Sequence, residues 1–92
     1  DGLAAIDAAQ AAAAGWAATP PRERAVILQR CYQAMVDQVD WLARLISLEN
    51  GKALSDARSE VLYAAEFFRW YAEEAVRING EIAMAPAGGN RI

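Results

Sequence analysis

The sequence predicts a mainly α-helical chain, and two observations support this prediction. Apolar residues recur in four separate stretches at the three- and four-residue spacing of one helix face. The boundaries between these stretches carry proline, glycine or asparagine, which end helices or open new ones. We therefore expect no strand between Val26 and Ile78. The chain of 92 residues is long enough for one small domain with a modest core.

The first two helices are expected at residues 2–18 and 20–37. The first is rich in alanine, and Trp16 at its end suggests docking on something larger. Thr19-Pro20-Pro21 marks the boundary, because Thr19 can cap a helix and proline suits a first turn. The apolar repeat of the second helix consists of Val26, Leu28, Cys31, Tyr32, Met35 and Val36.

A third helix is expected at residues 39–50. The apolar repeat is interrupted at residues 37–40, where Asp37 or Asp40 could cap the start of this helix. Its apolar positions are Trp41, Leu42, Leu45, Ile46 and Leu48. It ends at Asn50-Gly51, a pair suited to a left-handed C-terminal cap.

The fourth helix, expected at residues 54–79 with Ser55 or Asp56 at its start, is the most strongly periodic element. One face carries Val61, Ala64, Ala65, Phe68, Ala72 and Ala75. Three pairs are spaced for surface ion pairs, namely Glu66 with Arg69, Arg69 with Glu73, and Glu73 with Arg77. A separate line follows Tyr63, Phe67 and Trp70. This line predicts either packing against a second neighbour or one wall of a ligand passage.

Asn79-Gly80 ends the fourth helix, and we expect an extended tail from there to the end of the sequence. Residues 82–84 alternate weakly, and Pro86 and the pair Gly88-Gly89 break the pattern. A single short strand without a partner cannot form a sheet. The tail therefore looks like the start of a structure outside this sequence.

Composition excludes several classes of function. The formal net charge of −3, with the basic residues scattered, argues against a nucleic-acid partner. Histidine is absent, which excludes Ser-His-Asp and Cys-His catalysis and any zinc site that needs histidine. Cys31 is the only cysteine, so an intrachain disulfide is impossible and a cytosolic location is favoured. We find no signal peptide and no run long enough to span a membrane.

Three features could carry chemistry, and each has a simpler interpretation. Cys31 lies mid-helix on an apolar stripe with no base to activate it, so a buried, unreactive thiol is expected. Glu73 and Glu74 point about 100° apart on a helix, which indicates solvated or paired carboxylates. Gly88-Gly89 lacks the strand and helix of a phosphate loop, so we expect a turn. No metal-ligating constellation is present, and the chain itself supplies no catalytic residue.

Four runs, AGWAATPPRERAVILQR, LARLISLENGKALSDARSEV, YAAEFFRWYAEEAVRINGE and APAGGNRI, carry a resemblance over essentially the whole chain. They resemble the N-terminal helical region of NAD(P)-dependent aldehyde dehydrogenases, most closely the succinate-semialdehyde dehydrogenase group. Leu48–Lys52 matches the LE-x-GK run of that family, although Ala53 stands where proline usually follows. Phe68–Ala72 matches its FRW-aromatic-A run.

The resemblance implies the N-terminal helical segment of a three-domain α/β fold. Residues 1–80 would pack on the cofactor-binding domain, and residues 81–92 would lead toward the oligomerisation strands of a cytoplasmic homo-oligomer. The parent enzyme would oxidise succinate semialdehyde or a similar aldehyde to a carboxylic acid with NAD or NADP. Its catalytic and cofactor-binding residues would lie after residue 92, and Cys31 does not match the motif of the family's nucleophile.

The resemblance also implies that the fourth helix borders the aldehyde tunnel near Tyr63, and we name Tyr63 and Phe67 as candidate substrate-entrance residues. Both ends of the sequence look like cuts, so we expect an N-terminal fragment. The alternative is an independent helical module that binds a partner protein. A full-length reading frame would separate the two.

Our first prediction is that the isolated 92-residue chain binds neither NAD nor NADP and oxidises no aldehyde, because nothing in it supplies a dinucleotide site or an activated thiol. Calorimetry with each cofactor and an absorbance assay for the reduced cofactor test this. Saturable binding, or turnover that disappears in Cys31→Ala, would contradict it.

Overall fold

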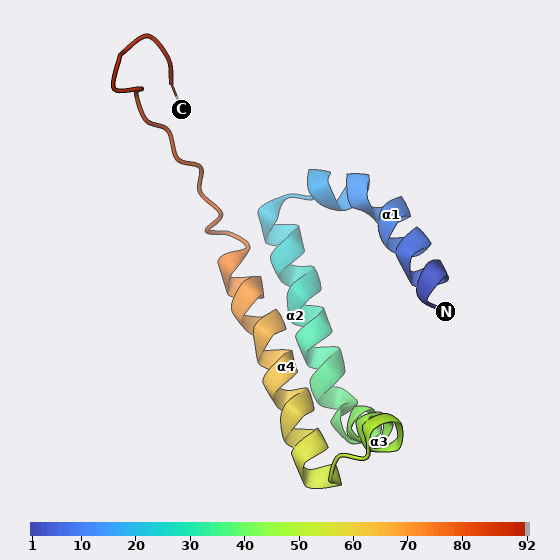
Figure 1. The fold of residues 1–92 in the computed structure, drawn as a ribbon. Coiled ribbons are helices and arrows are strands. Elements are labelled where there is room, and N and C mark those ends of the chain that lie inside the picture. The colour runs from blue at the N-terminus through green and yellow to red at the C-terminus, as the bar shows by residue number, and fades with distance from the viewer. Residues whose placement is uncertain (92) are drawn as a thin grey trace.

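A computed structural model describes residues 1–91 and shows a mainly helical, elongated molecule with extents of 60 × 27 × 24 Å (Figure 1). Its helices are α1 (Gly2–Ala18), α2 (Pro21–Asp37), α3 (Val39–Asn50) and α4 (Leu54–Glu74). The prediction of four helices, with no strand between Val26 and Ile78, is confirmed. α2 and α4 run antiparallel side by side, α3 lies across one end of the pair, and α1 and the tail lead away from the other end (Figure 1).

α4 is shorter than predicted, because it ends at Glu74 rather than near Asn79. Ala75 is the last buried residue of this stretch, while Val76 is 39% and Ile78 75% exposed. The first turns of α2 still lie beside this stretch, since Val26 shares a groove with Val76, and Leu28 shares another with Ile78. Burial falls after Ala75, however, and packing supplies most of the stability of a helix, so the helix is not continued to Asn79.

Of two predicted caps, Gly51 caps the expected helix and Thr19 caps a different one. Gly51 caps α3 as predicted, in the left-handed conformation with φ 74°, and its N–H donates to Ser47 O at 2.9 Å. Thr19 was predicted as a cap for the next helix, but it closes α1 instead. Its hydroxyl donates to Gly15 O at 2.8 Å and its N–H to Trp16 O at 3.1 Å, while Pro20 takes the N-cap position of α2.

The predicted side-chain caps of α3 and α4 are wrong. Gln38 is the junction residue before α3, and Ala53 holds the N-cap position of α4; neither makes a side-chain capping bond. Ser47 helps to fix the loop instead, since its hydroxyl donates to Lys52 O at 2.8 Å. The ion pair of Lys52 with Glu60 then ties the loop to the second turn of α4.

The core is small and consists of two contacts with α4. Against α3, the cluster contains Val39, Ala43, Ala57 and Val61, with Leu42, Ile46 and Leu62 packed on it. Toward α2, Ala65 and Ala72 of α4 are buried, and so is Ala75 directly after the helix. The predicted apolar face of α4 is thus confirmed in its small residues, whereas Phe68 is 36% exposed and lies at its edge.

Surface ion pairs agree with the prediction in part. Arg69 pairs with Glu66 at 2.8 Å as expected, and its guanidinium also lies 5.5 Å from the ring centroid of Tyr32 on α2. Arg77 pairs at 2.8 Å with Glu74 and not with Glu73. The predicted spacing needs an unbroken helix through residue 77, and α4 has already ended at Glu74.

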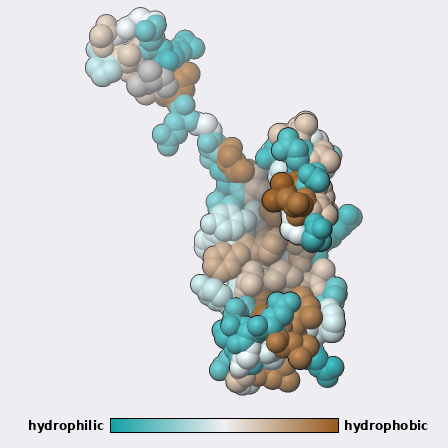
Figure 2. All heavy atoms as spheres, turned by 45° about the vertical axis from the view of Figure 1, so that its right-hand side comes forward, coloured by the Kyte–Doolittle hydropathy of each residue, from teal (hydrophilic) through white to brown (hydrophobic). Residues whose placement is uncertain are grey.

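Apolar side chains remain on the surface at both ends of the molecule (Figure 2). α1 has no buried residue, and its Leu3 and Ile6 are 74% and 64% exposed. On α3, Trp41 and Leu48 are exposed. These side chains find no cover within residues 1–91.

The tail is extended as predicted, but it folds back on itself. Met84 and Arg91 form an isolated antiparallel bridge, and Ala85 N–H donates to Asn90 O at 2.9 Å. The turn runs from Pro86 to Gly89, with Gly88 N–H donating to Ala85 O at 2.8 Å and with Gly88 and Gly89 at φ of 77° and 83°. This confirms the predicted turn at the glycine pair. The expectation that the alternating stretch has no partner in the chain is therefore wrong. Its possible continuation at Ile92 lies outside the described residues.

Our second prediction concerns the contact between α2 and α4. Ala65 is fully buried, so Ala65→Leu should lower the free energy of unfolding by about 1–3 kcal/mol through overpacking. Ala34→Leu on the exposed face of α2 is the matched control, with an expected change within about 0.5 kcal/mol. Urea unfolding followed by circular dichroism measures both variants. Equal effects of the two substitutions would show that the alanine contact is loosely packed.

Candidate functional site

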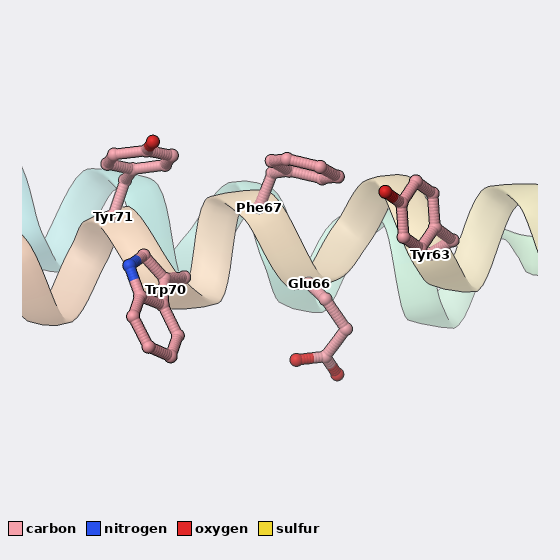
Figure 3. Close-up of a pocket in the computed structure, with 5 residues that line it drawn as sticks. All are labelled: Tyr63, Glu66, Phe67, Trp70 and Tyr71. Atoms are coloured by element: carbon pink, nitrogen blue, oxygen red, sulfur yellow. The ribbon is translucent and has the colours of Figure 1, made fainter.

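α4 presents an aromatic groove on the side that faces neither α2 nor α3 (Figure 3). The groove has a volume of about 340 Å³ and is lined by Tyr63, Glu66, Phe67, Trp70 and Tyr71. All five lining residues come from α4, so the groove is open along its length. A ligand site here would need a second element to supply the other wall.

The two predicted entrance residues contact each other. The rings of Tyr63 and Phe67 are 5.2 Å apart between centroids with an interplanar angle of 85°, an edge-to-face arrangement that aromatic pairs prefer. This contact follows from their i, i+4 spacing, which places two side chains on the same face of a helix, and α4 is regular across both residues. The structure thus brings Tyr63 and Phe67 together as the sequence pattern predicts.

Trp70 and Tyr71 modify the predicted line. Tyr71 points to the same side of α4 as Phe67 and Tyr63, whereas Trp70 and Glu66 point to the other side (Figure 3). The groove therefore runs between an upper row of three rings and a lower edge. Tyr71 was missed by the sequence analysis, although its spacing of four residues from Phe67 was visible there.

The exposed fractions of the three rings test whether the predicted aromatic line packs against another helix of residues 1–91. Tyr63 is 69%, Phe67 49% and Trp70 63% exposed, so none of the helices in residues 1–91 packs over them. Packing against a helix of this chain is therefore excluded. Contact with an element beyond these residues and contact with a ligand both remain compatible with the exposed rings.

The groove is almost entirely apolar, and its single carboxylate is already paired. Glu66 Oε2 lies 2.8 Å from an amino nitrogen of Arg69, which neutralises the charge at the lower edge. The remaining polar atoms are the tyrosine hydroxyls and the indole N–H. Such a surface suits a carbon chain or a flat apolar group and offers no strong anchor for a charged one.

The other residues considered for catalysis or ligand binding lie in settings that indicate a structural role. Cys31 is half-buried on α2, Glu74 is bound to Arg77, and the two glycines lie in the tail turn, where no helix follows a strand. Across residues 1–91 no three His, Cys, Asp or Glu side chains lie close enough to hold a metal ion. Over the same residues, none of the helices has the length and apolar character needed to cross a membrane.

Comparison with known proteins places these helices in a family. The model of the aldehyde dehydrogenase family matches residues 1–92, so the chain belongs to the aldehyde dehydrogenase family.

Among individual relatives, the chain is 47% identical over 92 residues to a succinate-semialdehyde dehydrogenase of Paenarthrobacter nicotinovorans, covering all of this chain and 20% of that protein. It is 49% identical over 78 residues to the NADP(+)-specific succinate-semialdehyde dehydrogenase of Escherichia coli, covering 85% of this chain and 16% of that protein. The chain thus spans about a fifth of the length of the curated relatives it matches.

Solved structures confirm that the helices are arranged as in this family. An aldehyde dehydrogenase from Brucella melitensis biovar abortus 2308 superimposes with a TM-score of 0.79 and 45% identity. The match covers 91% of this chain and 17% of the other. A succinate-semialdehyde dehydrogenase from Burkholderia pseudomallei gives a TM-score of 0.76 over 89% of this chain and 17% of the other.

Our third prediction tests whether the groove is ordered by its own rings. A double-mutant cycle with Tyr63→Ala and Phe67→Ala should give a coupling free energy of about 0.5 kcal/mol, the low end for aromatic pairs, because both rings are largely in water. Phe67 and Tyr71 have the same spacing but no edge-to-face contact in residues 1–91, and they serve as the control pair. Equal coupling in the two cycles would mean that the edge-to-face geometry adds nothing.

Proposed function

We propose that this chain is the N-terminal helical segment of an enzyme that oxidises an aldehyde to a carboxylic acid with NAD or NADP. One observation carries the proposal, namely 47% identity to a succinate-semialdehyde dehydrogenase over every residue of the chain. The substrate class follows from the names of the relatives. Beside the succinate-semialdehyde enzymes, a glutarate-semialdehyde dehydrogenase of Pseudomonas putida is 46% identical over 77 residues. Both names describe a short aldehyde with a carboxylate at the far end.

The cofactor would be held by residues outside this segment. The names of the relatives from Escherichia coli and Saccharomyces cerevisiae specify NADP(+), which supports a nicotinamide cofactor for the parent enzyme. The glycine pair does not fit a dinucleotide, because Gly88 and Gly89 form a hairpin turn and no helix N-terminus follows them to receive a phosphate. The segment would therefore act through packing and through the groove.

Scaffolding is the first proposed role. Residues 1–80 would pack on the cofactor-binding domain of the parent, which the exposed apolar residues of α1 and α3 support. The tail, residues 81–92, would lead into the oligomerisation strands of a homo-oligomer, and its bridged Met84 already has extended pairing. A cytoplasmic location is part of this proposal, because a single free cysteine, Cys31, fits a reducing compartment. The human relative is named as mitochondrial.

A wall of the substrate entrance is the second proposed role. The exposed edge-to-face pair of Tyr63 and Phe67 offers an apolar surface to a passing carbon chain. The nearest cation, Arg69, is occupied by Glu66, so this wall does not fix a carboxylate. Tyr63 and, to a smaller extent, Phe67 would contact the tail of the aldehyde and not its reacting carbonyl.

No finding favours the alternative of an independent interaction module. The similarity to aldehyde dehydrogenases extends from residue 1 to residue 92 and includes the groove residues. The exposed apolar faces that such a module would use would instead be covered by the parts of the enzyme that this chain does not span.

Our fourth prediction is made for the full-length enzyme. Tyr63→Ala should change the relative kcat/KM between succinate semialdehyde and a longer aldehyde by about 1–3 kcal/mol, because an apolar contact with the tail is lost. Steady-state reduction of NADP measures the change. Melting temperature should fall little, since Tyr63 is the most exposed ring of the groove.

Two variants serve as controls for this experiment. Trp41→Ala removes an aromatic side chain outside the groove and should leave the preference among aldehydes unchanged. Phe68→Ala removes a more buried ring from the other side of α4 and should lower the melting temperature more than Tyr63→Ala does. If Tyr63→Ala destabilises the enzyme as much as Phe68→Ala and leaves substrate preference unchanged, the aromatic line is packing only.

A further inference from the structure

α1 contributes nothing to the core, so burial does not set its direction. None of its residues is buried, and it leaves the top of α2 at an angle and points away from the bundle (Figure 1). Within residues 1–91, the apolar contact of α1 with the bundle lies at its C-terminal end, where Trp16 is 39% exposed and shares a groove with Leu28 and Tyr71. The restraint therefore has to come from the junction between α1 and α2.

Part of the restraint lies in the backbone of the junction. Only Thr19 and Pro20 separate the two helices, and both are extended, with φ and ψ of −68° and 130° for Thr19 and −59° and 147° for Pro20. Each of them precedes a proline, which disfavours helical ψ values, and the rings of Pro20 and Pro21 fix φ. This limits the path of the chain, but ψ keeps a range of tens of degrees, enough to swing a helix of 17 residues widely.

Contacts of the Arg24 side chain restrict the remaining variation in the angle between α1 and α2. From the first turn of α2, its Nε donates to Thr19 O and its Nη2 to Ala17 O, both at 2.8 Å, and its guanidinium lies 5.8 Å from the ring centroid of Trp16. One planar group thus holds the linker, the last turn of α1 and the aromatic residue at the end of α1. Hydrogen bonds from a charged donor are about twice as strong as neutral ones, and a cation suits the C-terminal end of a helix.

We propose that Arg24 is a clasp that sets the angle between α1 and α2 and holds α1 as a preset arm. The orientation of α1 is then encoded within residues 16–24 and exists before any other part of a larger protein contacts it. The angle between the helices is fixed because Nε and Nη2 belong to one rigid guanidinium group and donate to different carbonyl oxygens. A single hydrogen bond would still allow rotation about its own axis. This assignment is independent of the proposed function.

The test measures the distance between the helices in the 92-residue chain. Nitroxide labels at Gln10→Cys on α1 and Gln29→Cys on α2, both exposed positions, are placed in a Cys31→Ala background. Pulsed electron resonance should give a narrow distance distribution for this parent. Arg24→Lys keeps the charge but not the fork, and it should widen the distribution by about twofold. Trp16→Leu, which removes only the ring contact, should widen it less.

Arg22→Lys is the matched control, because Arg22 lies on the same first turn but donates to no backbone carbonyl of α1 in the part of the chain described. Its distribution should equal that of the parent. The proposal is overturned by a broad distance distribution in the parent or by distance distributions of equal width in Arg24→Lys and Arg22→Lys. It is also overturned if Arg24→Lys loses more helical circular dichroism than Arg22→Lys, because Arg24 would then support helix α1 itself and not its direction.

Discussion

The close approach of α2 and α4 is the contact on which the rest of the structure depends. The buried residues on the α2 side are Ala65 and Ala72 of α4 and Ala75 directly after it, and no side chain larger than valine is buried in residues 1–91. Alanine brings two helix backbones together and leaves each helix little apolar area to contribute. The pair is consequently held by many small contacts, and α4 ends next to Ala75, the last buried residue of this stretch.

This arrangement explains why the aromatic groove is exposed. The side of α4 toward α2 and α3 is filled by alanine and valine, and rings of the size of Tyr63 or Phe67 would hold the helices apart there. The large side chains are therefore placed on the opposite side, where they contact one another along the helix. A packing constraint on one face thus produces a concentrated aromatic surface on the other, and that surface is available for an entrance wall.

The sequence predicted those parts of the structure that depend on local chemistry. The four helices, the left-handed cap at Gly51, the turn at Gly88-Gly89 and the contact of Tyr63 with Phe67 each follow from spacing or from backbone conformation. The errors fall where a distant residue decides. The end of α4 depends on where burial against the rest of the chain stops. Arg77 pairs with Glu74 because the helix has ended, and Thr19 closes α1 because prolines already open α2. Tyr71 is a different case, because its spacing was visible and was not used.

The two ends of the α2–α4 pair are organised by different forces, and this bears on how such a segment joins a larger enzyme. At the α3 end, burial of Val39, Ala43, Ala57 and Val61 fixes the geometry through the hydrophobic effect, which has no preferred direction. At the α1 end, where burial is lacking, directional hydrogen bonds from Arg24 perform the same task. An arm held by directional bonds can present exposed apolar residues such as Leu3 and Ile6 at a defined angle without burying them first. The surfaces left open on α1, on α3 and along the groove are therefore oriented by the segment itself, and a partner covering them would only have to match a surface already in place.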